Sequence, residues 1–121
     1  METVSFITAE LGDDLIVSFA VQGRRDPAAI RSLTLLRTPK YEAFLPSEER
    51  GVSASFEGHD LGETDHILAV AYSQAERVLT IRTQATEYVL DLGQVDSEEL
   101  KEMRRVLRRM NHDHRMQYAG V

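Results

Sequence analysis

The sequence predicts an α+β fold in which about seven antiparallel strands form a barrel-like or sandwich-like sheet and one amphipathic helix follows them. Between residues 2 and 92, short runs alternate apolar and polar residues, and turn-forming residues separate these runs. From about Ser97, apolar residues instead recur at steps of three and four, as in a helix. At 121 residues the chain has the length of one domain, so we expect residues 1–121 to share one core.

Strand-like alternation recurs in order along the chain. In the first run, Val4, Phe6 and Thr8 are expected to share one face of the sheet, because successive strand residues point to opposite faces. The last two runs are expected to form a hairpin around residues 84–86. The seven predicted strands occupy residues 3–8, 15–22, 30–37, 52–57, 67–72, 78–82 and 88–92.

The helix is predicted from about Ser97 to Met116. Asp96 is expected to cap the first free amides, and Glu99 is expected to reach back and complete a capping box. A buried stripe is expected along this helix at Leu100, Met103, Leu107, Met110 and His114. Seven strands followed by one helix is similar in element order to the pleckstrin-homology-like barrel, in which the helix closes one open end. A plain sheet covered by the helix and a two-sheet sandwich have the same element order.

Composition excludes several classes of function. The chain has no cysteine, which excludes disulfides, thiol nucleophiles and thiolate metal sites. It has no run of eighteen apolar residues and no signal-peptide pattern, so we expect a cytoplasmic protein without a membrane partner. No glycine-rich loop joins a strand to a helix, and no nucleophile elbow is present, so no cofactor is expected. The net charge of −6 opposes bulk attraction to nucleic acid.

The segment 38–51 is the first candidate for partner binding. It carries Tyr41, Phe44 and Leu45 between two prolines, and loops of this length without regular structure are often functional. Prolines restrict the backbone and so lower the entropy cost of presenting an apolar surface to a partner. In the alternative interpretation, Phe44 and Leu45 fold back onto the core and close the edge of the sheet.

The arginine-rich face of the predicted helix is the second candidate. Arg104, Arg105, Arg108 and Arg109 include like-charge pairs one turn apart, each costing about 0.2–0.5 kcal/mol in an isolated helix. The helix dipole, the acidic remainder of the chain, or an external anion such as nucleic acid could compensate this repulsion. No aromatic residue alternates with these arginines, which makes stacking of nucleic-acid bases less expected.

A histidine-rich and acidic segment is the third candidate. Imidazole and carboxylate groups can ligate a divalent metal or perform acid–base chemistry. The spacing matches neither a calcium-binding EF-hand loop nor the helical zinc signature, and turn formation explains the same residue types. The residues in question are His59, Asp60, Glu63, Asp65 and His66.

The sequence therefore predicts a non-enzymatic binding or adaptor module that acts through contact with a protein, either a different protein or a second copy in a homodimer. One alternative is the binding of nucleic acid or another anionic partner through the arginine face. The other is a metal-dependent enzyme centred on residues 59–66.

Overall fold

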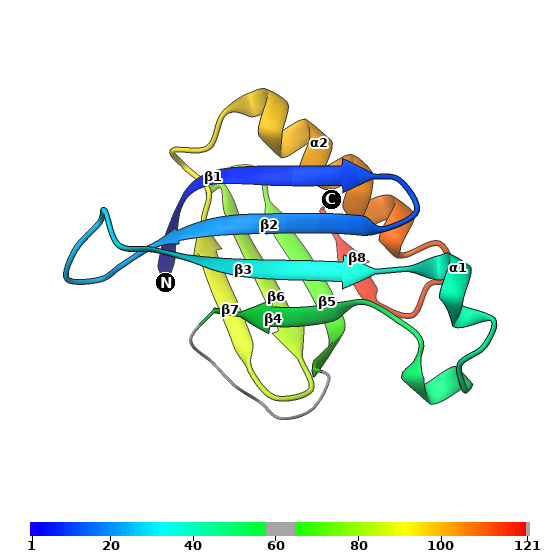
Figure 1. The fold of residues 1–121 in the computed structure, drawn as a ribbon. Helices are drawn as coiled ribbons and strands as arrows, with labels where there is room; N and C mark the ends of the chain where they lie inside the picture. Colours follow the sequence, from blue (N-terminus) through cyan, green and yellow to red (C-terminus); the bar gives the residue numbers. More distant parts are fainter. Residues whose placement is uncertain (58–64, 121) are drawn as a thin grey trace.

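The computed structural model describes residues 1–57 and 65–120, and within these residues it shows an α+β fold with one long helix near the C-terminus (Figure 1). The expected α+β class is confirmed, but these residues form eight strands where seven were predicted. The elements are β1 (Glu2–Leu11), β2 (Leu15–Gln22), β3 (Ile30–Arg37), α1 (Pro39–Glu42), the short 3₁₀ helix η1 (Ser47–Glu49), β4 (Ser53–Phe56), β5 (Asp65–Ser73), β6 (Val78–Thr83), β7 (Glu87–Asp91), α2 (Ser97–Met110) and β8 (Gln117–Ala119).

The sheet forms a ring. Its strand order is β4-β3-β2-β1-β7-β6-β5-β8, and an additional pairing between β4 and β5 closes the first seven strands on themselves. Consecutive strands from β1 to β7 are antiparallel, so the first and seventh run in the same direction and their pairing is parallel. The β1–β7 and β4–β5 contacts each cover only two residue pairs. The ring therefore consists of two layers, β1–β4 and β5–β7, which meet at two short corners (Figure 1).

The hydrophobic core lies between the two layers and is covered along one side by α2, which packs against β1 and β2. Burial of this apolar surface is the main favourable contribution to folding. The largest fully buried side chains include Phe19, Leu33, Leu35, Leu79, Ile81, Leu90, Met103, Leu107 and Met110. The described helices include none that is both long enough and apolar enough to cross a membrane.

Strand β1 differs from the predicted alternation. A bulge between Val4 and Phe6 shifts its register against β2. One inserted residue moves every following side chain to the other face. Val4 and Ile7 are therefore buried, whereas Phe6 is 47% exposed, and the prediction that Val4, Phe6 and Thr8 share one face is wrong.

The helix ends six residues earlier than predicted. It stops at Met110, and Asn111 closes the following turn, because its side chain accepts from the Met116 amide (3.0 Å) and donates to the Met116 carbonyl (3.3 Å). His114 has a positive φ of 57° and is exposed, so its predicted place in the apolar stripe is wrong. The chain then continues as β8, which pairs in parallel with β5.

The start of α2 confirms one predicted contact and corrects another. Asp96 caps the helix, since its side chain accepts from the Glu98 amide at 2.8 Å. Glu99 does not complete a capping box; its carboxylate accepts from the Ile7 amide at 2.6 Å instead. Because α2 packs against β1, this carboxylate lies beside a part-buried amide that needs an acceptor.

Candidate functional site

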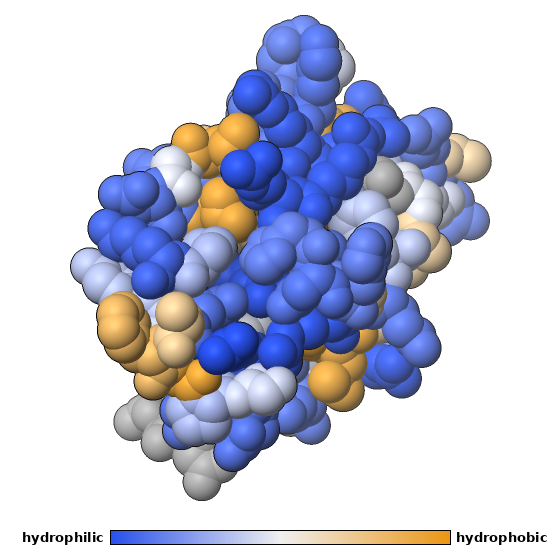
Figure 2. Space-filling view, turned by 90° about the vertical axis from the view of Figure 1, so that its right-hand side faces the viewer, coloured by the Kyte–Doolittle hydropathy of each residue, from blue (hydrophilic) through white to orange (hydrophobic). Residues whose placement is uncertain are grey.

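The segment 38–51 presents three large apolar side chains to solvent. It was predicted as an irregular loop, but it contains α1, with Pro39 in the first turn, and η1. Tyr41 is 59% exposed, Phe44 is 84% exposed and Leu45 is 38% exposed. Phe44 therefore does not fold back onto the core, and we call these three residues the apolar ridge. Figure 2 shows this end of the molecule, where separate apolar patches interrupt a mostly hydrophilic surface.

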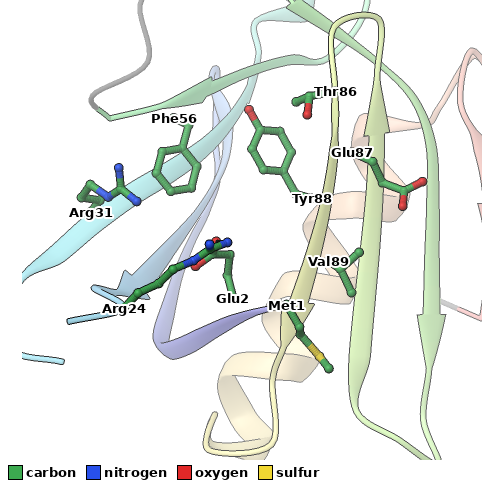
Figure 3. A pocket seen from close by; sticks show the side chains of 9 residues that line it. All are labelled: Met1, Glu2, Arg24, Arg31, Phe56, Thr86, Glu87, Tyr88 and Val89. Atoms are coloured by element: carbon green, nitrogen blue, oxygen red, sulfur yellow. The ribbon is translucent and has the colours of Figure 1, made fainter. Parts of the chain in front are cut away.

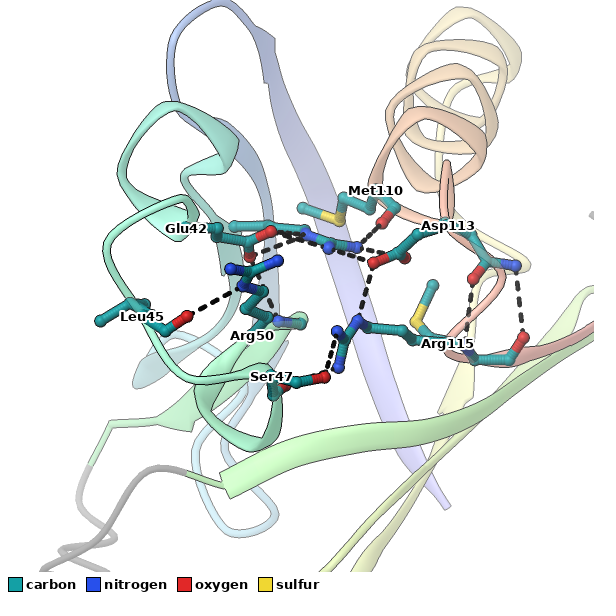
Figure 4. A network of polar contacts seen from close by, with 11 residues as sticks. Glu42, Leu45, Ser47, Arg50, Met110, Asp113 and Arg115 are labelled. Atoms are coloured by element: carbon teal, nitrogen blue, oxygen red, sulfur yellow. Dashed lines mark hydrogen bonds and ion pairs between the residues drawn. The ribbon is translucent and has the colours of Figure 1, made fainter.

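A buried arginine anchors this segment. The side chain of Arg37, at the end of β3, is 1% exposed and donates to both carboxylate oxygens of Glu42 at 2.8–3.1 Å. It also donates to both oxygens of Asp113 at 2.9 and 2.7 Å, and to the Met110 carbonyl at 2.7 Å. All five N–H groups of the guanidinium thus have acceptors. β3, α1 and the turn after α2 therefore meet at this one cation, and Figure 4 labels its partners Glu42, Met110 and Asp113.

A second arginine extends the contacts to η1. Arg115 donates to Asp113 (2.7 Å), to the Ser47 carbonyl (2.8 Å) and to the Ser47 hydroxyl (3.1 Å). The Gly51 amide donates to Glu42 at 3.2 Å. We call Arg37, Glu42, Asp113 and Arg115 the Arg37 network. Its contacts include Glu42 of α1 and Ser47 of η1, so it fixes the chain before and after Phe44 and Leu45 (Figure 4).

The charges of this network shift the pKa values of its members. Hydrogen bonds from Arg37, and then from Arg115, hold the pKa of Asp113 well below its usual range. Burial alone would raise the pKa of Glu42, but hydrogen bonds from Arg37 and from the Gly51 amide outweigh it, and the pKa is lowered. The hydrogen bond to Asp113 is the main cause that raises the pKa of Arg37. The carboxylates and the guanidinium are therefore charged at neutral pH.

The four predicted arginines of the helix face do not form one continuous strip. Arg105 pairs with Glu102 at 3.7 Å on the same helix. Arg108 lines a hollow beside Tyr118, whereas Arg109 lines a different hollow with Asp13 and Lys40, which are themselves an ion pair. Arg104 lines a third.

The hollow beside Arg104 combines two distant segments of the chain. It has a volume of about 500 Å³ and lies between the first turns of α2 and the turn that joins β5 to β6. We call it the α2 recess; it is lined by Tyr72, Gln74, Arg77, Ser97, Leu100, Lys101 and Arg104. Sequence reasoning did not select Arg77, because nothing in the local pattern places a β5–β6 turn beside the helix.

A further pocket, of about 480 Å³, opens between the start of β7 and the end of β4. The rings of Phe56 and Tyr88 lie nearly parallel there, with centroids 5.7 Å apart, and the guanidinium of Arg31 lies 4.8 Å from the Phe56 centroid. Arg24 pairs with Glu2 at 2.8 Å at its rim (Figure 3). This pocket combines aromatic surface with charges of both signs.

The predicted metal segment is only partly described. His59, Asp60 and Glu63 lie outside the described residues. Asp65 is buried and accepts from the Ala85 amide at 3.1 Å, and its other carboxylate oxygen has no hydrogen-bond partner among the residues that the structure describes. His66 follows it in β5, and successive strand residues point to opposite faces. Among residues 1–57 and 65–120, no three histidine, aspartate or glutamate side chains are grouped closely enough to hold a metal ion.

Comparisons with protein-family models, with curated proteins and with solved structures found no match to this chain. A functional argument for it therefore depends on the geometry of its own residues.

Proposed function

We propose that this protein is a non-enzymatic binding or adaptor module that contacts a protein partner through the apolar ridge of Tyr41, Phe44 and Leu45. The observation that carries the proposal is the 84% exposure of Phe44 on a segment held in place by buried charges. Aromatic side chains dominate interface energetics, and a surface that is already ordered loses less entropy on binding. The absence of cysteine supports the further proposal that the module works in the cytoplasm.

The charge around the ridge favours one kind of partner. Glu48 and Glu49 of η1 are exposed next to the ridge, and the chain carries a net charge of −6. Complementary potentials accelerate association and select partners, whereas like charges oppose it. We therefore propose a partner with an apolar cleft and a basic rim. Self-association of this acidic surface is the less favoured arrangement and is one outcome of the experiment.

The experiment compares wild type with Phe44→Glu, and uses Ile30→Glu as a matched control. Ile30 is also an exposed apolar residue, but it lies at the start of β3, at the other end of that strand from the 38–51 segment. Light scattering on a size-exclusion column first gives the mass of each variant. A partner captured on wild type is then purified, and its dissociation constant is measured by calorimetry against all three proteins.

The proposal requires Phe44→Glu to weaken binding of the purified partner more than tenfold, because a charge replaces the most exposed aromatic contact. Ile30→Glu should change the dissociation constant less than twofold. A wild-type dimer that Phe44→Glu dissociates would identify a second copy as the partner. Equal binding by all three proteins would refute the proposal, and so would a large loss of thermal stability in Phe44→Glu, because Phe44 would then be a packing residue.

We also propose that the ring has the element order of the pleckstrin-homology-like barrel. Two observations support this: seven consecutive strands complete the ring, and α2 follows β7 directly in the chain. The added strand β8, which pairs with β5, departs from that order. The likeness carries no functional argument, since one architecture hosts many functions.

A further inference from the structure

The α2 recess brings three cations together from two parts of the chain. Lys101 and Arg104 lie three residues apart on α2 and so share one face of the helix. Arg77 comes from the β5–β6 turn, where it has a positive φ of 54°. None of the described residues that line the recess is acidic; its other polar groups are the Gln74 amide and the hydroxyls of Ser97 and Tyr72.

None of these three cations has an ionic partner among residues 1–57 and 65–120. The ion pairs among the described residues involve Arg24, Arg37, Lys40, Arg105 and Arg115, and include none of the three that line the recess. Like charges around one hollow repel, and an anion between them would remove that repulsion. The excess positive charge is notable because the chain as a whole is acidic.

Arg104 is positioned by neutral groups. The side-chain amide of Gln74 has one orientation in which both its oxygen and its nitrogen face suitable partners. In that orientation its oxygen accepts from Nη1 of Arg104 at 3.2 Å and from Nη2 of Arg104 at 3.1 Å. The Nε atom of Arg104 is buried and has no hydrogen-bond acceptor in the described part of the chain. A buried donor without an acceptor costs free energy. The guanidinium is thus held in place while its charge stays uncompensated.

We propose that the α2 recess binds the phosphate group of a small phosphate monoester. A phosphate dianion offers several acceptor oxygens, which suit the planar donor set of a guanidinium and the point charge of an ammonium. A volume of about 500 Å³ is within the usual range for a small-molecule site. This site lies on a different surface from the apolar ridge, and the proposal does not depend on the protein-binding function.

Two other hollows are less suited to an anion, because a carboxylate already pairs with a cation in each of them. In the pocket between β4 and β7, Glu2 already neutralises Arg24, and in the hollow beside Arg109, Asp13 pairs with Lys40. Nucleic acid fits the α2 recess less well than a phosphate monoester. A backbone needs cations along a line and gains from exposed aromatic rings, whereas these cations surround one hollow and Tyr72 is buried.

The experiment is a titration of the ¹⁵N-labelled protein with phenyl phosphate at constant ionic strength, followed by amide chemical shifts. Amides of the recess, at Gln74, Ser97 and Lys101, should move and saturate. The wild-type dissociation constant should be on the order of 1 mM or tighter. Arg104→Gln should weaken binding at least fivefold. Arg105→Gln is the matched control, because Arg105 is the adjacent residue, pairs with Glu102 and does not line the recess; it should change binding less than twofold.

The titration includes one substitute variant and three control ligands. Lys101→Gln, at an exposed position, replaces Arg104→Gln if that variant does not fold, and the same loss is expected. Sodium chloride and phenol alone should not move the recess amides. Shifts that do not saturate, an equal response to chloride, or equal losses in Arg104→Gln and Arg105→Gln would overturn the proposal. Tighter binding of a single-stranded oligonucleotide without a terminal phosphate at the same amides would overturn it in favour of nucleic acid.

Discussion

Two arginine-centred regions lie at opposite ends of α2, and they use positive charge differently. At the C-terminal end, Arg37 is buried, and every N–H group of its guanidinium meets a carboxylate or a carbonyl. At the N-terminal end, Arg104 shares the α2 recess with Lys101 and Arg77, and its contact there is the neutral amide of Gln74. Within the described residues, the charges of the first region are balanced by ion pairs, whereas the cations of the second region have none.

The partners of a cation distinguish a structural role from availability to a ligand. A buried cation whose donors are all used has no capacity left for a ligand, and it fixes the segments that supply its acceptors. A cation held by neutral groups keeps its electrostatic attraction for an external anion. Substitutions in the two regions should therefore differ in magnitude, and even in sign.

The largest expected effect is the loss of Arg37. In Arg37→Met, the buried carboxylate of Glu42 loses its ionic partner and Asp113 keeps only Arg115, and breaking a buried ion pair costs about 3–5 kcal/mol. We expect a value near the lower end, because the Asp113 side chain is 30% exposed. Urea denaturation measures the change in the free energy of unfolding.

Arg104→Met is the matched control for that measurement. It removes a cation that has no ionic partner among the described residues, so we expect a change within about 0.5 kcal/mol. Equal losses in the two variants would contradict the distinction between a balanced and an unbalanced arginine.

The second prediction concerns pH. The pKa values of Asp113 and Glu42 are lowered in the folded state, so their contribution to stability is complete above their unfolded pKa values, about 4. It is lost as the pH falls from there towards the folded pKa values. Asp113→Asn should therefore lower the free energy of unfolding by about 1–2 kcal/mol at pH 7 and by clearly less at pH 2.5, as measured by urea denaturation at both pH values.

Asp91→Asn serves as the control for the pH experiment, since the Asp91 carboxylate accepts from the Gly93 amide and takes part in no ion pair among the described residues. The loss of unfolding free energy in Asp91→Asn should change less between the two pH values than the loss in Asp113→Asn. A cost of Asp113→Asn that is the same at pH 7 and pH 2.5 would show that the charge of Asp113 does not stabilise the Arg37 network.

The sequence predicted the regular parts of the fold and missed the points where one residue changes the pattern. The alternation located β2 and β3 at their observed bounds, because both strands are regular and pair along their whole length. It missed the bulge in β1 and the end of α2. A bulge leaves no compositional signal in a strand of mixed residues, and the stop at Asn111 depends on its contact with Met116, five residues away.

The candidate surfaces were predictable only where one local segment supplies them. Tyr41, Phe44 and Leu45 were selected because they are close in the sequence. The Arg37 network was not, because Arg37 looks like the polar end of a strand and its partner Asp113 lies 76 residues away. The α2 recess was missed for the same reason, since Arg77 approaches the helix only through the pairing of β5 and β6.

The smallest expected effect is a gain in stability. Gln74→Glu would place a carboxylate where the Gln74 amide now contacts Arg104, so Arg104 would acquire a carboxylate partner, as Arg37 already has. We expect the free energy of unfolding to rise by about 0.5 kcal/mol at low salt, the usual size for an exposed ion pair, and this increase should shrink at 0.5 M NaCl. Gln84→Glu, in the β6–β7 turn, is the control and should not stabilise the protein, because it adds negative charge to a chain that is already acidic. Gln74→Glu should also weaken phenyl phosphate binding, since the new carboxylate competes for the same guanidinium. If Gln74→Glu instead destabilises the protein as much as Gln84→Glu does, Arg104 is already compensated and the contrast between the two ends of α2 is not electrostatic.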